Sequence, residues 1–384
     1  MLVFQVSQHL PLFWPFMFYF TTVVRGLPAS DFGFLKSIYY FSVMAVEVPF
    51  GVVADRLGRR WTLVLGALAT SVGCAGYVFG RSFLAYAAGE LCFACGTALV
   101  SGADTALLYD AFAADGRAHE FPRAKGALES VGLAGAGIAF PLSGFLVTAN
   151  GDPTPAYAVS ALIPLVGAAA ALSTVEPPRT SELRVSSHVA ETFRDLGRTP
   201  GLIATVAFSA LVYLGLRAAN ALVWNPVLAA AGIPLGALGV LTAAVTLLAA
   251  WTAWRAHAWR ERVGEPALTL GLALSVTAMY LALPFAHGPF AAALLVSHGF
   301  ALGVVPVVLA DVLNRRIASP DRRATLLSFE SLAQRGAYGV VVIFASAALE
   351  RHSLDTVLLG FAATSAAAAA LAPLVTRGSE PRTG

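Results

Sequence analysis

The chain has 384 residues, of which 57% are hydrophobic and 12% are charged, and its formal net charge is +3. A water-soluble domain carries roughly 25% charged residues, so this composition excludes an ordinary soluble enzyme and predicts helices that face lipid or one another. The small net charge, without a basic patch, argues against a nucleic-acid partner. The three Cys all fall inside apolar segments and give no disulfide framework.

Twelve apolar segments reach the roughly 20 residues that a membrane-spanning helix needs. They lie at about residues 3–25, 32–54, 61–79, 83–111, 125–148, 156–174, 200–226, 234–254, 266–286, 289–313, 324–348 and 354–375. The first has no basic leader, so we interpret it as a span and not as a cleavable signal peptide. The sequence therefore predicts an all-α integral membrane protein with twelve transmembrane helices.

The longest polar stretch separates spans six and seven. It divides the chain into residues 1–175, a connector at 176–199 and residues 200–384. Most Lys and Arg residues fall on one side of the predicted membrane if both termini lie in the cytoplasm, as the positive-inside rule requires. Heavy use of Arg and Ala suggests a GC-rich bacterial genome, so we expect a multi-pass protein of a bacterial inner (cytoplasmic) membrane.

The two halves repeat each other in order. Gly26-Leu27-Pro28 recurs as Gly232-Ile233-Pro234, and Asp55-Arg56-Leu57-Gly58 recurs as Glu261-Arg262-Val263-Gly264. Ala103-Asp104 and Glu129-Ser130 recur as Ala310-Asp311 and Glu330-Ser331. Ordered matches along several spans predict two pseudo-symmetric six-helix halves around a central cavity.

The loop between the second and third spans reads GVVADRLGRR over residues 51–60. Anchoring at a membrane edge explains the arginines, but it does not explain Asp55 or the two glycines. Gly58 permits a sharp turn, and Gly51 lets a neighbouring helix approach closely. This pattern resembles the loop between helices two and three of the major facilitator superfamily of secondary transporters.

The resemblance implies a carrier that works by alternating access. Its loop would lock the two halves together on the cytoplasmic side while the carrier faces outward. The gating residues on this interpretation are Gly51, Asp55, Arg56, Gly58, Arg59 and Arg60. Asp110, which closes the fourth span, is the expected acidic partner of one arginine. Plain positive-inside anchoring is the alternative for the arginines.

Two acids inside spans of the first half are candidates for proton coupling. Glu47 lies in the second span and Asp104 in the fourth, and carboxylates at such depth are functional by default. For Glu47 the alternative is a structural hydrogen bond near the kink at Pro49. Glu129 and Glu330, which open their spans, are expected to have a structural role at the helix ends.

Five polar or aromatic residues inside the spans of the second half are candidates for substrate binding: Arg217, Asn220, Trp224, His298 and Arg335. Helical spacing puts the first three on one face, which combines a cation, an amide and an aromatic ring. The alternative for the two arginines is pairing with acids between helices. We expect His298 to be a hydrogen-bonded interior histidine, with proton coupling as the alternative.

The fifth span is rich in glycine and partly resembles the signature of drug–proton antiporters. Gly144 keeps the first of the closing glycine pair after Pro141, but Phe140 and Phe145 stand where the signature has glycine. This partial resemblance favours antiport as the type of transport. Close helix packing is the other explanation for the small residues.

No phosphate-binding loop, metal-ligand cluster or catalytic triad is present in the sequence, so we expect neither an enzyme nor an ATP-driven pump. We expect no cofactor and no metal, with the proton gradient as the energy source. The predicted function is proton-coupled export of a small organic molecule, anionic or amphipathic, by a monomer in the lipid bilayer. Proton-coupled uptake, and a receptor-like member without flux, are the alternatives.

Overall fold

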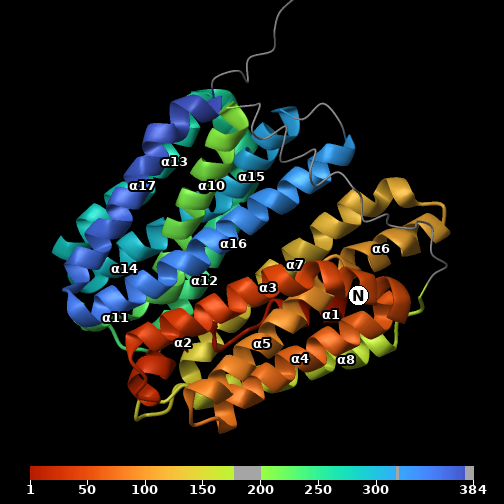
Figure 1. Ribbon diagram of the computed structural model, residues 1–384, viewed down its shortest axis with the longest axis horizontal. Helices are drawn as coiled ribbons and strands as arrows, with labels where there is room; N and C mark the ends of the chain where they lie inside the picture. The colour runs from red at the N-terminus through yellow and green to blue at the C-terminus, as the bar shows by residue number, and fades with distance from the viewer. Residues whose placement is uncertain (177–199, 317–319, 377–384) are drawn as a thin grey trace, which may run out of the picture. The chain divides into compact units, whose positions relative to one another are not determined.

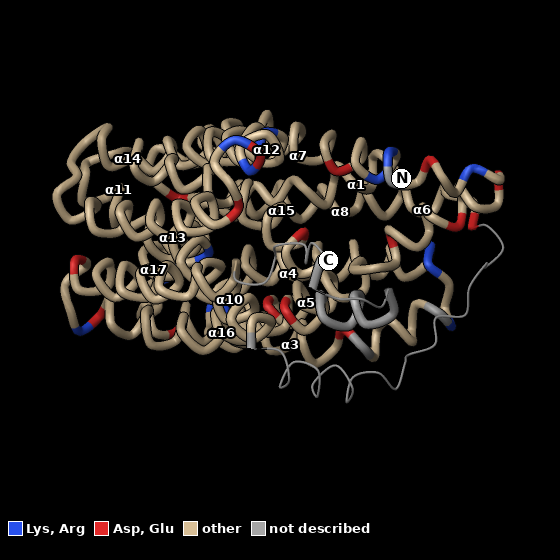
Figure 2. Tube along the Cα trace, turned by 90° about the horizontal axis from the view of Figure 1, so that it is seen from above, with Lys and Arg blue, Asp and Glu red and all other residues tan. Residues whose placement is uncertain are grey.

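All the regular secondary structure in the described part of the chain is helical (Figure 1). The computed structural model describes residues 1–176, 200–316 and 320–376, and the side chains of Val48, Asp55, Pro122, Pro200 and residues 314–327 lie outside that description. Within it, ten helices are long and apolar enough to cross a membrane. Charged residues are sparse along these helices (Figure 2), because a charge at the centre of a bilayer costs roughly 3 kcal/mol or more.

Two of the twelve predicted spans are not among these ten helices of the described chain. The second predicted span is a helix of 29 residues, Ala29–Leu57, which carries Lys36 and Glu47 in its interior. The first is interrupted after Gln8, and its apolar part, Trp14–Val24, is short. The count of twelve spans therefore remains a prediction.

Contacts along the chain divide the molecule into two units, of which the first comprises Met1–Leu183 and Leu235–Ala243. The helices of the first unit are α1 (Leu2–Gln8), η1 (Trp14–Phe16), α2 (Met17–Tyr19), η2 (Phe20–Val24), α3 (Ala29–Leu57), α4 (Arg59–Phe79), α5 (Phe83–Val100), α6 (Ala103–Ala114), η3 (Ala118–Glu120), α7 (Phe121–Phe145) and α8 (Thr154–Leu172). α4 packs against both α5 and α8, α3 packs against α5, and α1 packs against α7 and α8.

The second unit comprises Arg184–Pro234 and Ala244–Gly384. Its described helices are α10 (Pro200–Ala218), η4 (Ala219–Val223), α11 (Trp224–Ala230), α13 (Glu265–Ala282), η5 (Leu283–Phe285), α14 (Gly288–Ser297), α15 (Gly299–Arg316), α16 (Pro320–Arg351) and α17 (Leu354–Thr376). α12 (Ala237–Val263) begins within the first unit and continues in the second. α10 packs against α16 and α17, and α17 also packs against α13.

Local residues set where several helices begin and end. Ser82 caps α5 by accepting a hydrogen bond from the backbone N–H of Ala85 at 3.3 Å, which satisfies an otherwise unpaired donor. The fourth predicted span divides into α5 and α6 at Gly102, whose φ of +83° is left-handed and favours glycine. The tenth divides into α14 and α15 at His298.

Two pairs of glycines in the sequence repeat adopt the same backbone conformation in both copies. Gly26 and Gly232 have φ values of +68° and +71°, and Gly58 and Gly264 have φ values of +99° and +80°. Gly58 precedes α4 and Gly264 precedes α13, each as the residue before the first helical turn. The repeat seen in the sequence thus recurs in the backbone of both units.

Aromatic rings fill the core of the first unit. The rings of Tyr77 and Tyr157 are stacked, with centroids 5.3 Å apart and planes 10° apart, and both residues are buried. Phe13 stacks on Tyr157 and Phe93, and Phe20 lies 4.4 Å from Tyr157 between ring centroids. This aromatic core holds α4, α5 and α8 against the first predicted span.

Candidate functional site

The loop between α3 and α4 is fixed by contacts with segments far away in the sequence. Gly58 has φ 99° and ψ 145°, a conformation that is essentially restricted to glycine. The guanidinium of Arg59 is buried and donates to the Asp110 carboxylate and to the backbone oxygen of Ala106 at 2.7 Å. The backbone N–H of Arg59 donates to Glu176 Oε1 at 2.7 Å. The expected pairing of Asp110 with a loop arginine is therefore present.

The remaining predicted gating residues are placed differently. Arg60 lies with its guanidinium carbon 5.6 Å from the ring centroid of Trp61, and Arg56 is exposed. A Cβ added to Gly51 would meet no atom within 4 Å, so the expected close helix contact is not formed at Gly51 among the described residues. The side chain of Asp55 lies outside the described residues.

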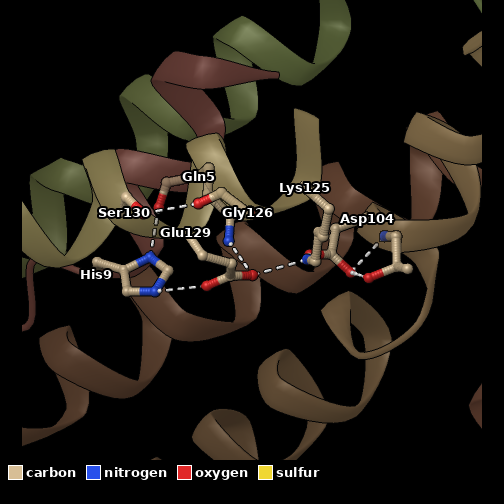
Figure 3. Close-up of polar contacts among 8 residues, drawn as sticks. Gln5, His9, Asp104, Lys125, Gly126, Glu129 and Ser130 are labelled. Atoms are coloured by element: carbon tan, nitrogen blue, oxygen red, sulfur yellow. Dashed lines mark hydrogen bonds and ion pairs between the residues drawn. The ribbon is translucent and has the colours of Figure 1, made fainter. Parts of the chain in front are cut away.

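A continuous chain of polar side chains joins α1, α6 and α7 (Figure 3). Lys125 Nζ lies 3.0 Å from Asp104 Oδ2 and 2.8 Å from Glu129 Oε1. Glu129 Oε1 also accepts from Gln5 Nε2 at 3.0 Å, and Glu129 Oε2 lies 3.4 Å from His9 Nε2. We call these five residues the α7 polar chain. It contains the proton-coupling candidate Asp104 and four partners from two other helices.

Helical spacing explains how three helices supply this chain. Lys125 and Glu129 are four residues apart on α7, and Gln5 and His9 are four residues apart across the end of α1, so each pair shares a face. His9 Nδ1 lies 2.9 Å from the backbone oxygen of Gln5, and a carbonyl only accepts, so Nδ1 carries a hydrogen. Nε2, which faces Glu129, is then the position where a second proton would bind.

The formal charges of the α7 polar chain do not cancel. Two carboxylates and one ammonium give a formal net charge of −1 when His9 is neutral. None of the five members is fully exposed. The exposed side-chain fractions are 13% for Asp104 and 39% for Glu129. Charge changes in such surroundings are screened less than at a surface.

Several members of the α7 polar chain were not predicted as a site. Glu129 was expected to be structural, and no role was predicted for Gln5, His9 or Lys125. A signal was nevertheless available, because polar residues in the opening turns of an apolar span need partners. Glu47, the other predicted proton-coupling residue, lies half-buried in α3 and is not part of the chain.

In the second unit, three of the five predicted substrate-binding residues lie together. His298 Nε2 is 3.1 Å from Asn220 Oδ1, and the rings of His298 and Trp224 meet edge to face with centroids 5.7 Å apart. Trp224 and His298 are each 2% exposed. His298 is therefore the hydrogen-bonded interior histidine that the sequence favoured.

The two contacts of His298 constrain its protonation. Nδ1 faces the backbone oxygen of Leu295, so Nδ1 carries a hydrogen. With Nδ1 protonated, Nε2 of a neutral ring can only accept, whereas Asn220 presents its Oδ1 to this nitrogen. A neutral ring fits after a half-turn of the Asn220 amide, because amide oxygen and nitrogen positions are assigned from such contacts.

The two arginines predicted to bind substrate are not members of this cluster. Arg217 lies in the last turn of α10, and Arg335 lies within α16, and both are half-buried. The hydrogen bond between His298 and Asn220 and the ring contact with Trp224 do not include them. The predicted five-residue site is thus one cluster of three residues and two arginines on neighbouring helices.

A buried ion pair that the sequence analysis did not single out lies in the first unit. Lys36 Nζ on α3 is 2.5 Å from Glu90 Oε1 on α5, and the exposed side-chain fractions are 9% and 1%. Tyr77 on α4 donates its hydroxyl to the same carboxylate oxygen, and Lys36 Nζ lies 3.6 Å from Met17 Sδ. The available signal was Glu90 itself, a carboxylate in the otherwise apolar run of residues 83–100.

Known proteins give the chain a family and a fold. Residues 9–328 match the family described as the Major Facilitator Superfamily. No curated protein matches the sequence.

Three solved structures have a similar fold over almost the whole chain. The nucleoside transporter NupG is 15% identical, with 98% of this chain and 97% of NupG covered at a TM-score of 0.78. A bacterial homolog of the human lysosomal transporter Spinster, inward-facing and unoccupied, is 16% identical, with coverage of 98% and 95% and a TM-score of 0.75. A D-xylose–proton symporter is 15% identical, with coverage of 97% and 96% and a TM-score of 0.73. Such low identities show the fold alone.

Proposed function

The chain belongs to the major facilitator superfamily, and on this premise we propose that it is a proton-coupled exporter of a small organic molecule. Membership makes it a multi-pass membrane protein and a secondary transporter, not an enzyme. Our proposal adds alternating access between two pseudo-symmetric halves of six spans around a central cavity. The ten long apolar helices of the described chain, together with α3 and Trp14–Val24, support a total of twelve spans.

The α7 polar chain is the observation that carries proton coupling. A proton can drive a conformational cycle only if a group binds it with different affinity in the two states. Asp104 is held by Lys125, and Lys125 is shared with Glu129, so a shift of one helix would change the partners of both carboxylates. We assign the coupling proton to this chain through Asp104, and we keep Glu47 as a second candidate because it lies within α3.

Substrate anchoring is assigned to the second unit. Asn220, Trp224 and His298 supply an amide, an aromatic ring and an imidazole in one cluster. Arg217 on α10 and Arg335 on α16 add positive charge elsewhere in the same unit. These groups suit an organic molecule with an apolar body and a negative charge or polarised oxygen. Uptake of such a molecule with protons is the alternative direction.

Gating is assigned to the loop at residues 51–60. This loop is held by the buried Arg59–Asp110 pair and by the Glu176 carboxylate, which accepts from the first backbone N–H of α4. A switch between two states needs such discrete contacts, which form in one state and break in the other. We further propose a monomer in a bacterial inner membrane with both termini in the cytoplasm, which the distribution of Lys and Arg supports.

The test uses purified protein in two steps. Thermal-shift measurements against anionic, cationic and neutral organic compounds select a ligand, and flux of that ligand is then followed in proteoliposomes with an imposed pH gradient. Asp104→Asn and Glu47→Gln are expected to reduce pH-driven flux, because each removes a carboxyl group that could bind the coupling proton differently in the two states. Arg217→Ala is expected to weaken ligand binding itself.

The matched control is Asp115→Asn, the same chemical change at an exposed turn after α6, which should leave the flux unchanged. The proposal is wrong if the two acid variants, alone and combined, keep the wild-type dependence of flux on the pH gradient. Flux that runs only with the substrate moving toward the more alkaline side would instead identify the protein as an uptake symporter.

A further inference from the structure

The same carboxylate position occurs once in each unit. Glu129 on α7 and Glu330 on α16 are equivalent in the sequence repeat. Glu129 accepts a hydrogen bond from Gln5 in the first predicted span, and Glu330 accepts one from Ser209 in the seventh. Spans one and seven are the opening spans of the two halves, so both units bind the carboxylate from the equivalent helix.

The two carboxylates differ in the charge of their partners. Glu129 contacts the ammonium of Lys125 and the imidazole of His9. Glu330 Oε1 accepts from Ser209 Oγ and from Gln334 Nε2 at 2.6 Å, and Gln334 Nε2 lies 2.7 Å from Ser209 Oγ. The partners of Glu330 are therefore a hydroxyl and an amide, which are both neutral.

The sequence accounts for this difference. Lys125 stands four residues before Glu129, whereas Leu326 stands four residues before Glu330. His9 stands four residues after Gln5, whereas Tyr213 stands four residues after Ser209. Both cationic or cation-forming positions of the first unit are thus replaced by residues that carry no positive charge.

Other charged and titratable groups on the surrounding helices do not compensate Glu330 within the described structure. α16 packs against α10, α15 and α17, and these four helices carry Tyr213, Arg217, Asp311, Asp355, Arg335, Tyr338, Glu350 and Arg351. Among the described contacts, none of these residues forms an ion pair or hydrogen bond with Glu330. The side chains of Arg315, Arg316, Asp321, Arg322 and Arg323 lie outside the described residues.

The Ser209–Glu330–Gln334 triad can hold both forms of the carboxyl group without moving a heavy atom. An ionised Glu330 accepts from the Ser209 hydroxyl and the Gln334 amide. A protonated Glu330 can donate to Ser209 Oγ, because a hydroxyl both donates and accepts and its hydrogen rotates. An ionised carboxylate without a cation is costly in a membrane-spanning helix, so the protonated form is the less costly one there.

We propose that Glu330 is a proton-exchanging carboxyl group in the second unit, and that its equivalent Glu129 stays ionised within the α7 polar chain. The inference deepens the proposed proton coupling and rests on it for its role in transport. On this inference the second unit, to which only substrate binding was assigned, also takes part in proton exchange. Ser209 and Gln334 are then positioning residues for that proton.

Infrared difference spectroscopy of the purified full-length protein tests this without a substrate. Spectra recorded as the pH is raised should contain a C=O band of a protonated carboxyl group that shifts in heavy water. Glu330→Gln should remove one component of this band, and Glu129→Gln, the matched control, should keep that component. Ser209→Ala removes one partner and should shift the frequency of the band while the group remains, which covers the case that Glu330→Gln does not fold.

The possible results separate this inference from the proposed function. The assignment is overturned if Glu330→Gln removes no component of the band, if the same component is lost in Glu129→Gln, or if the wild-type protein has no such band. A band that is lost only in Glu330→Gln supports the assignment even if no pH-driven flux is found. In that case the proposed coupling fails, while proton exchange at Glu330 stands.

Discussion

Lys36 and Glu90 show how strongly one buried contact can constrain a membrane protein. Each charge would be costly alone inside a membrane-spanning helix, and the partner on the next helix offsets that cost. Tyr77 adds a hydrogen bond to the same carboxylate oxygen and ties α4 to the pair. The pair therefore fixes the mutual register of α3, α4 and α5.

This arrangement makes a prediction about single and double substitutions. Glu90→Gln leaves a buried ammonium without its partner and is expected to lower the free energy of unfolding by roughly 3–5 kcal/mol. Lys36→Met leaves a buried carboxylate and should have a similar effect. Combining Lys36→Met with Glu90→Leu removes both charges and should restore most of the loss. The measurement is the free energy of unfolding of the purified protein. The prediction is contradicted if the double variant loses as much free energy of unfolding as the two single variants together.

A second residue-scale feature is the contrast between a carboxyl group with a cationic partner and one whose partners are neutral. Glu129 and Glu330 occupy equivalent positions, and only Glu129 has cationic partners among the described residues. The same side chain therefore has different neighbours in the two units, although its position in the repeat is the same.

At the scale of elements, the α3–α4 turn depends on one glycine. Gly58 lies between two long helices with a left-handed φ of 99°, and a Cβ there would lie 2.8 Å from Glu176 Oε2. Any other residue would strain the turn and displace the carboxylate that accepts from the first backbone N–H of α4. The sharp turn and the Glu176 contact therefore require the same small residue.

Gly58→Ala is accordingly expected to lower the free energy of unfolding by roughly 1–3 kcal/mol, the cost of holding a side chain in this backbone conformation. Gly51→Ala is the matched control in the same motif, because a Cβ at Gly51 meets nothing within 4 Å and alanine favours a helix by about 1 kcal/mol over glycine. The temperature of thermal unfolding should therefore fall for Gly58→Ala, and it should rise or stay unchanged for Gly51→Ala. Equal destabilisation at both positions would show that the turn is not the cause.

At the scale of the whole molecule, each unit is a helical bundle with its own buried polar contacts. The first has the α7 polar chain and the Lys36–Glu90 pair, and the second has the Asn220–Trp224–His298 cluster and the Ser209–Glu330–Gln334 triad. Buried polar groups in lipid-facing helices must satisfy one another, and this requirement places specific residues opposite each other within each unit.

The proposed orientation in the membrane predicts which turns face the cytoplasm. In a chain whose three Cys are replaced by Ser, His119→Cys places a thiol at an exposed position of the short helix η3 before α7. Ala149→Cys places one in the exposed turn before α8. A membrane-impermeant thiol reagent should label position 149 in intact cells and position 119 only after permeabilisation, because the basic residues around Arg117 favour the inside. The reverse pattern would invert the topology.

Local sequence determined the class of the protein and the places where its helices turn. Apolar runs of spanning length gave the helices, and Gly58 and Gly264 marked two turns before helices, because length, hydropathy and the need for positive φ act over a few neighbouring residues. The loop at residues 51–60 identified the family through the same local pattern. Asp110 was paired with an arginine of this loop as expected.

Only the tertiary structure decided which polar groups meet. Asp104 was a candidate by its depth, but its connection through Lys125 to Glu129 and His9 depends on how α6, α7 and α1 pack. Glu90 finds Lys36 on another helix for the same reason. Helical periodicity tells which residues share a face, whereas the partner on the facing helix follows from crossing angle and register. Crossing angle and register arise from the packing of many side chains, so the sequence of any one segment does not determine them.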